Sequence, residues 1–324
     1  MLFITNRMLR QSSRTRIGRT IDFDLRRNEA GQSVFFCERQ DTDTYIELGN
    51  ENFFRGLKES GYEQLLIYIH GYSNLPEPHI FPTAQVLQHL FDQAEPKLVQ
   101  VIPIIWPCDT DFGMVKDYWD DQQAADASAF AFARVFEKFM AWREGDENIE
   151  EPCLKRINIL AHSMGNRVFR GTIKAWGKYF RSYRLPLIFR NVFMAAADLV
   201  NETLEGLDGG LLCETARNVA VYYASDDVAL RASKVANVAS KVASRRLGHT
   251  GPENMSKVPK NVFAIDCDDI NTVYNPPIGH SYFTYDETGS RPGLVFQHIF
   301  NAIKTGRVEV DVPGGKTRVL RLAA

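Results

Sequence analysis

The sequence predicts an α/β fold with a largely parallel central sheet and helices on both of its faces. Short apolar runs alternate along the chain with longer stretches whose apolar residues recur at helical spacing. The runs are continuously apolar rather than alternating, as strands covered on both faces require. Several runs end in small or polar residues, which places candidate functional loops at the carboxyl ends of the strands.

The predicted strands begin at the N-terminus and continue through most of the chain. A first run covers 2–6, and two short runs separated by polar turn residues predict an N-terminal antiparallel hairpin. Later runs predict the parallel part of the sheet. The hairpin ranges are 33–38 and 44–48, and the parallel strands are 64–69, 99–106, 156–161, 189–196, 218–224 and 261–266.

Between these runs, much of the chain has apolar residues at the spacing typical of helices. The aromatic stripe from Phe130 to Trp142 is expected to pack in the core. The tail 307–324 alternates and then contains Pro-Gly-Gly, which predicts a small hairpin. The predicted helices are 83–94, 117–142, 164–180, 227–243 and 292–304.

Neither an internal repeat nor a low-complexity linker divides the chain, so we expect a single domain over residues 1–324. Two irregular segments, 107–122 and 267–279, follow predicted strands. Because loops at strand ends commonly carry function, these segments are candidate walls or lids of a pocket.

Composition narrows the class of protein. Hydrophobic residues make up 44% and charged residues 24%, which suffices for a sizeable core. The formal charge of −2 gives no overall field that would attract nucleic acid or an anionic membrane, so no nucleic-acid partner is expected. The five cysteines are scattered and form no C-x-x-C pair, which favours a reducing compartment over a disulfide framework or zinc site.

The first residues contain no secretory apolar segment, and no run is long enough for a membrane span. We therefore expect a cytoplasmic protein. The sequence specifies no oligomeric state.

The strongest chemical signal is Ala161-His162-Ser163-Met164-Gly165, which links an apolar strand to a helical stretch. A serine at the apex of such a sharp turn is exposed for attack, and the turn tolerates only small residues two positions away. Ala161 and Gly165 meet that requirement. We predict that Ser163 is a nucleophile, that the N–H of Met164 helps to form an oxyanion hole, and that His162 lines the pocket.

A second signal is His70-Gly71-Tyr72, directly after the strand 64–69. Gly71 allows the backbone to approach the serine closely and to line the pocket. The N–H of Tyr72 is the expected second oxyanion donor. His70 is expected to be a hydrogen-bonded structural group.

A serine hydroxyl needs a base to remove its proton, and in this arrangement the histidine comes last in the chain. His280 occupies a loop between the last predicted parallel strand and the last predicted helix, which is the expected position of the base. His249 is the alternative. His298 falls within a predicted helix and is expected to be structural.

The base in turn needs a carboxylate to orient it. Asp227 follows the strand 218–224 and is the preferred acid. Its neighbour Asp226 is an alternative, with a helix N-cap as its competing role. Asp198, after the strand 189–196, is a further alternative and a candidate pocket-lining residue.

Taken together, these motifs resemble a bacterial family of α/β-hydrolases of unknown function. The resemblance implies the α/β-hydrolase fold, a nucleophile at Ser163, an acid at Asp227 and a base at His280, but no particular substrate. It is carried by Leu2-Phe3-Ile4-Thr5-Asn6-Arg7, His70-Gly71-Tyr72, Ala161-His162-Ser163-Met164-Gly165, Ala196-Ala197-Asp198, Ser225-Asp226-Asp227-Val228-Ala229-Leu230 and Gly279-His280-Ser281-Tyr282-Phe283.

We therefore expect a serine hydrolase that cleaves an ester or related acyl bond of a small molecule through an acyl-enzyme, with no metal or organic cofactor. One alternative is another reaction on the same residues, such as thioester, lipid or peptide hydrolysis. The other is a non-catalytic binding or scaffold protein that retains the fold.

Overall fold

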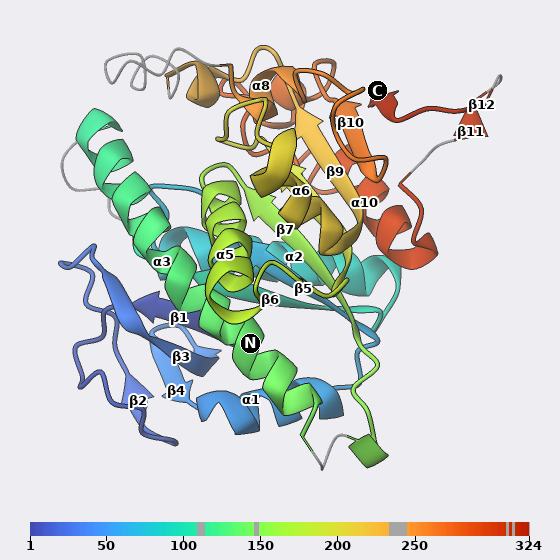
Figure 1. Ribbon diagram of the computed structural model, residues 1–324. Coiled ribbons are helices and arrows are strands. Elements are labelled where there is room, and N and C mark those ends of the chain that lie inside the picture. The colour runs from blue at the N-terminus through green and yellow to red at the C-terminus, as the bar shows by residue number, and fades with distance from the viewer. Residues whose placement is uncertain (109–113, 146–148, 233–244, 309–310, 313–314, 324) are drawn as a thin grey trace.

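An eleven-stranded sheet forms the centre of the molecule, with helices on both faces (Figure 1). The computed structural model describes residues 1–324 except 109–113, 146–148, 233–244, 309–310, 313–314 and 324. The strand order is β13-β10-β9-β8-β7-β5-β6-β1-β3-β4-β2. Neighbours from β13 to β1 are parallel, whereas β1, β3, β4 and β2 pair antiparallel. The predicted fold class is thereby confirmed.

The strands lie close to the predicted ranges, including the N-terminal hairpin of β3 and β4. In the tail, the predicted hairpin exists as β11 and β12, but β13 then joins the main sheet beside β10, which the sequence did not indicate. The bounds are β1 Leu2–Arg7, β2 Thr20–Ile21, β3 Ala30–Asp41, β4 Thr44–Glu47, β5 Gln64–Ile69, β6 Val99–Ile105, β7 Arg156–His162, β8 Phe189–Ala195, β9 Ala216–Tyr223, β10 Val262–Asp266, β11 Asp311–Val312, β12 Gly315–Lys316 and β13 Val319–Arg321.

Four of the five predicted helices correspond to α2, α3, α5 and α10. The fifth, 227–243, falls mostly on 233–244, outside the described residues. In the described part of the chain, no helix has the length and apolar character needed to span a bilayer. The bounds are α1 Gly49–Glu59, η1 Pro76–Ile80, α2 Phe81–Ala94, α3 Met114–Arg143, α5 Gly165–Phe180, α6 Gly206–Glu214, α8 Leu247–Thr250, α9 Asn271–Tyr274 and α10 Leu294–Thr305.

The core consists of two apolar clusters, one on each face of the sheet. In β5, Leu65 and Ile69 belong to the cluster under α3 and α5, whereas Leu66 and Tyr68 belong to the cluster under α2 and α10. Successive side chains of a strand point to opposite faces, so a strand covered on both sides is apolar throughout. The continuous runs seen in the sequence have this cause.

A row of buried amide side chains crosses four neighbouring strands near their amino ends. Asn191 in β8 donates to the side-chain oxygen of Asn158 in β7 at 2.8 Å, and Asn218 in β9 donates to that of Asn191 at 2.8 Å. Asn158 donates to the side-chain oxygen of Gln64 in β5 at 3.3 Å. These bonds satisfy polar groups that would otherwise be costly to bury.

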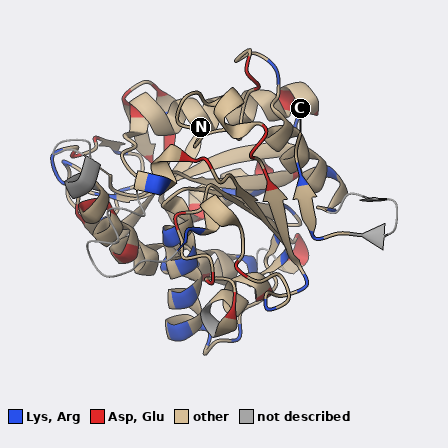
Figure 2. Cartoon of the chain, turned by 90° about the horizontal axis from the view of Figure 1, so that it is seen from above, with Lys and Arg blue, Asp and Glu red and all other residues tan. Residues whose placement is uncertain are grey.

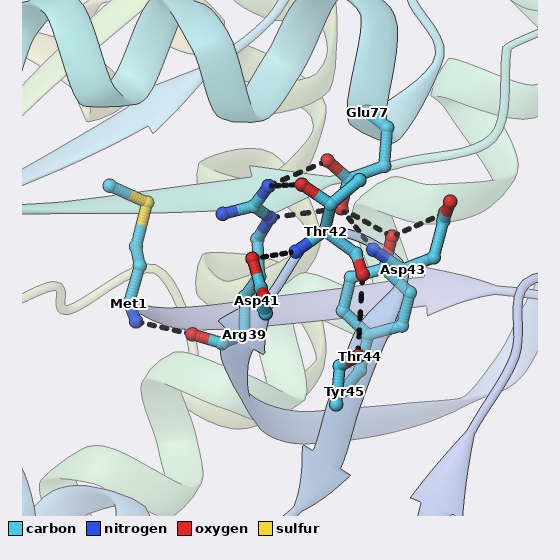
Figure 3. Close-up of polar contacts among 8 residues, drawn as sticks. All are labelled: Met1, Arg39, Asp41, Thr42, Asp43, Thr44, Tyr45 and Glu77. Atoms are coloured by element: carbon cyan, nitrogen blue, oxygen red, sulfur yellow. Dashed lines mark hydrogen bonds and ion pairs between the residues drawn. The ribbon is translucent and has the colours of Figure 1, made fainter.

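The N-terminal strands are fastened to the segment that follows β5 by one ion pair (Figure 3). The guanidinium of Arg39 contacts both carboxylate oxygens of Glu77, at 2.9 and 2.8 Å. The hydroxyl of Tyr45 donates to Glu77 at 2.6 Å, and the N-terminal amine of Met1 donates to the carbonyl of Arg39 at 2.7 Å. The contacts to Glu77 connect β3 and β4 to η1, just beyond the Gly71 loop, and the bond from Met1 holds the N-terminus on β3.

Candidate active site

Ser163 lies at a sharp turn between β7 and α5. Its φ of 52° is in the left-handed region, which non-glycine residues seldom occupy. A Cβ at Gly165 would lie 2.4 Å from the carbonyl oxygen of Ile69 and 2.5 Å from that of His70. Because both atoms belong to the backbone of β5 and its following loop, the turn excludes any larger residue at 165.

Asn166 fastens this turn from within, a role that no motif in the sequence predicted. Its buried side-chain N–H groups donate to the carbonyls of Ala161 at 2.9 Å and Ser163 at 3.1 Å. The N–H of Ser163 donates to the carbonyl of Ala195 in β8 at 3.0 Å. The sequence could have indicated this role, because an asparagine in the first turn of a helix commonly forms hydrogen bonds with nearby backbone groups.

The structure pairs His280 with Asp227. The ring Nδ1 of His280 lies 2.7 Å from Oδ2 of Asp227, whose side chain is fully buried. The other oxygen, Oδ1, accepts the N–H of Leu230 at 2.9 Å. A carboxylate at Nδ1 places the ring proton there and leaves Nε2 as the acceptor.

The adjacent carboxylate, Asp226, faces elsewhere. It accepts a hydrogen bond from the side chain of Asn271 at 2.5 Å. The capping role considered for Asp226 belongs instead to Asp227, because Asp227 accepts the N–H of Leu230 three residues later.

The Asp–His pair lies beside the serine turn. Nε2 of His162 is 3.1 Å from the carbonyl oxygen of His280, and the two ring centres are 4.8 Å apart. Asn275 accepts the N–H groups of His280 and Ser281, at 2.9 and 3.0 Å. The segment 267–279, predicted as a pocket wall or lid, thus holds the loop that carries His280. Part of the other candidate segment, 107–122, is outside the described residues.

Gly71, which precedes Tyr72, lies against the serine turn. A Cβ at Gly71 would lie 3.0 Å from the Cβ of Ser163 and 3.2 Å from Nδ1 of His162. The side chain of Asn74 donates to the carbonyl of Tyr72 at 2.7 Å, which fixes this loop. Met164 directly precedes α5 and is buried. Of the two predicted oxyanion donors, Tyr72 therefore follows a residue that adjoins Ser163, and Met164 is the next residue after Ser163 in the chain.

Asp198 is also close to the serine, but its carboxylate has other partners. Its N–H donates to the carbonyl of Ser163 at 3.2 Å. Its carboxylate accepts the hydroxyl of Tyr118 at 2.7 Å and lies 3.2 Å from Nε of Arg246. All three side chains are buried. The structure thus gives Asp198 an arginine partner, whereas Asp227 contacts the imidazole.

The remaining candidate bases lie in helices. His249 is in the short helix α8, and its N–H donates to the carbonyl of Arg246 at 2.9 Å. His298 is in α10, where its ring contacts the hydroxyl of Tyr222 at 2.7 Å and the carbonyl of Val308 at 3.2 Å. Those contacts agree with the structural role predicted for His298.

Two buried histidines near the serine are held neutral. Burial lowers the pKa of His70 to about 3; its Nε2 accepts the N–H of Trp106 at 3.2 Å, so Nδ1 donates to the carbonyl of Gly71 at 2.8 Å. His70 is a structural group, as predicted. Burial, and then the nearby His280, lower the pKa of His162 well below its usual value.

Acid should therefore destabilise the protein through these two histidines. Unfolded histidine has a pKa of about 6.5, so the unfolded chain binds protons that the folded chain resists below that pH. The stabilisation is fully present above about pH 6.5 and is lost as the pH falls towards the folded-state values, by up to about 1.4 kcal/mol per pH unit for each histidine. Urea unfolding between neutral and mildly acidic pH measures this slope.

The control is His89, an exposed histidine in α2. We expect His89→Gln to keep the wild-type pH dependence and His70→Gln to reduce it. An unchanged slope in His70→Gln would contradict the assignment of His70.

All five cysteines are buried and none forms a disulfide. Among the described residues, no three His, Cys, Asp or Glu side chains gather in a group that could hold a metal ion.

A mostly parallel sheet flanked by helices, with a serine at the turn after a central strand, is typical of α/β-hydrolases. Residues 48–292 match the family described as "Alpha/beta hydrolase of unknown function (DUF900)". The chain belongs to this family, which confirms the resemblance seen in the sequence.

Two solved structures show a distant likeness. Phospholipase PlaB from Legionella pneumophila, in complex with thio-NAD, has 16% sequence identity and a TM-score of 0.27, over 66% of this chain and 39% of the phospholipase chain. A lipase-esterase related protein from Clostridium acetobutylicum has 12% identity and a TM-score of 0.22, over 65% of this chain and 75% of its own. This chain therefore spans well under half of the phospholipase. No curated protein matches the sequence.

Proposed function

We propose that this protein is a serine hydrolase that cleaves an ester or related acyl bond through an acyl-enzyme on Ser163. The observation that carries the proposal is the Asp227–His280 contact of 2.7 Å beside a serine with φ of 52°. A carboxylate on Nδ1 leaves Nε2 of an imidazole free to accept a proton, which is the requirement for activating a hydroxyl.

In the proposed reaction, Nε2 of His280 takes the proton of Ser163 as the serine oxygen attacks the substrate carbonyl. The N–H groups of Tyr72 and Met164 stabilise the resulting oxyanion. His280 then protonates the leaving alcohol, and the carbonyl re-forms as the acyl-enzyme. Water, deprotonated by His280, attacks this acyl group and releases the acid, which restores Ser163.

Asp227 acts on His280 rather than on the substrate. Its buried carboxylate keeps the ring proton on Nδ1 and stabilises the imidazolium that forms in each step. A charge in a buried site interacts more strongly than the same charge in water. Gly71, His162 and Asp198 would line the pocket next to the serine. Each step uses groups of the chain and water, so the proposal calls for no cofactor.

A fluorophosphonate probe tests whether Ser163 is activated. Such probes react with serines whose proton is removed by a neighbouring base, so we expect one covalent label on the peptide that contains Ser163. Ser163→Ala should abolish the label, whereas Ser256→Ala, at an exposed serine, should retain it. An unlabelled wild-type protein would favour the alternative of a non-catalytic binding protein.

The acyl group is a separate question, because one catalytic arrangement serves many substrates. A panel of aryl esters of increasing acyl length, with matched thioesters and a peptide, would rank these classes by kcat/KM.

A further inference from the structure

One stretch of this chain carries basic residues and no acidic ones. Residues 152–197 contain no Asp or Glu, although the whole chain has a formal charge of −2. Within α5, Arg170, Lys174 and Lys178 follow one another at intervals of four and share one face of the helix. Figure 2, with Lys and Arg in blue, shows several basic turns stacked on one another in the lower part of the view. The nine basic residues of the stretch are Lys155, Arg156, Arg167, Arg170, Lys174, Lys178, Arg181, Arg184 and Arg190.

Large apolar side chains are exposed around the last turn of α5. Phe130, predicted to be in the core, is 46% exposed and packs its ring on Tyr179 at 5.5 Å and on Phe180 at 5.9 Å. Tyr179 is itself 60% exposed, and Leu187 in the following segment is 67% exposed. The prediction for Phe130 was wrong, because these contacts with the end of α5 cover only part of its ring. Contiguous exposed apolar groups commonly mark an interaction surface.

The turn after α5 holds a further aromatic residue outward. Ser182 and Tyr183 have φ values of 47° and 62°, in the left-handed region that bulky residues rarely adopt. The N–H of Tyr183 donates to the carbonyl of Gly177 at 2.8 Å, which closes the turn onto the helix end. Tyr183 is 49% exposed. An unfavourable backbone conformation is thus retained at a position that presents an aromatic ring to solvent.

We propose that this surface binds an anionic lipid membrane from the outside, as a peripheral contact. Basic side chains are attracted to anionic headgroups, while tyrosine and leucine enter the boundary between headgroups and acyl chains. Nζ of Lys178 lies 4.9 Å from the centre of the Tyr179 ring, so charge and apolar area occupy the same spot. We call this surface the α5-end patch, and it consists of Phe130, Lys174, Lys178, Tyr179, Tyr183, Arg184 and Leu187.

Two other partners fit the α5-end patch less well. A second copy related by a two-fold axis would bring two copies of the same positively charged patch together, which is repulsive. Single-stranded nucleic acid uses a basic groove that follows the backbone, with aromatic rings for stacking. The exposed aliphatic side chain of Leu187 has no role in such stacking, whereas it suits a lipid boundary.

The α5-end patch is remote from Ser163. Gly165 and Lys178 mark opposite ends of α5, and thirteen residues of helix at about 1.5 Å each separate them by about 20 Å. Binding through the patch therefore tethers the protein to a membrane and leaves the serine turn uncovered. The inference does not depend on hydrolytic activity.

Co-sedimentation with lipid vesicles tests the proposal. We expect the full-length protein to sediment with vesicles of phosphatidylcholine containing about one third phosphatidylserine, but not with phosphatidylcholine alone. At about fivefold for each basic residue, the variant Lys174→Gln/Lys178→Gln/Arg184→Gln should lose about a hundredfold in affinity. Raising the salt from about 0.1 M to about 0.5 M should weaken wild-type binding.

The matched control removes the same charge elsewhere, with Arg26→Gln/Arg55→Gln/Lys260→Gln at exposed positions, and should bind as the wild type does. A second variant, Tyr179→Ser/Leu187→Ser, should weaken binding without altering charge. Turnover of a soluble aryl ester should be unchanged in all these variants, which separates this test from the hydrolase proposal. The proposal fails if the wild type stays in the supernatant, or if the patch and control variants bind the vesicles alike. It also fails if single-stranded DNA binds more tightly than the vesicles, or if the patch variants convert a dimer to a monomer.

Discussion

Replacing Ser163 by alanine is expected to lower kcat for an aryl ester by about 10⁴- to 10⁶-fold, because no other hydroxyl takes over the attack. KM should change little, since the side chain removed is small and the binding surface remains. Initial rates with purified protein, corrected for spontaneous hydrolysis, measure the effect.

The matched control is Ser225→Ala. Ser225 lies just after β9, at the same edge of the sheet, and its hydroxyl donates to Asp268 at 2.9 Å. We expect nearly wild-type turnover from this variant. Undiminished hydrolysis by Ser163→Ala would refute the proposed mechanism.

Asp227→Asn should lower kcat by about 10⁴-fold while preserving the fold. An amide at this position can donate to Nδ1 of His280, which would place the ring proton on Nε2. A ring in that tautomer has no acceptor for the proton of Ser163. Steady-state kinetics, together with circular dichroism to check folding, measure the outcome.

Asp226→Asn and Asp198→Asn complete the comparison of the three candidate acids. Asp226 faces Asn271, so its variant should retain turnover within a few-fold. Asp198→Asn leaves Arg246 without its buried counter-charge, so its larger effect should be on stability, measured as a lower urea midpoint. A collapse of kcat in Asp226→Asn with normal activity in Asp227→Asn would reverse the assignment.

The parts of the fold that could be predicted are those set by local pattern. β5 and β7 are mostly apolar without alternation because both faces of the sheet are covered. The serine turn was recognisable as a short local motif, although the atoms that exclude a larger residue at 165 are the distant carbonyls of Ile69 and His70. Helix α6 was missed because its glycines lower helix propensity, and α1 because only Phe53, Phe54 and Leu57 form its apolar face.

The features of the site that could not be predicted depend on contacts between residues that are far apart in the chain. Asp226 and Asp227 are neighbours of the same type, and only the surrounding loops decide that one faces Asn271 and the other His280. The pairing of Asp198 with Arg246 joins residues far apart in the chain. Phe130 has the spacing of a core residue, but its ring contacts with Tyr179 and Phe180 leave it 46% exposed.

The buried amide row of Gln64, Asn158, Asn191 and Asn218 has a consequence for strand register. Apolar strands alone could pair in several alignments, because one branched side chain replaces another with little penalty. Sliding one strand by a single residue would move its amide about 3.3 Å and turn it to the opposite face of the sheet, breaking the row. The row therefore selects one alignment, and that alignment places the carboxyl ends of β5, β7, β8 and β9 level with one another, where Gly71 adjoins Ser163 and where the segment that leads to Asp227 begins.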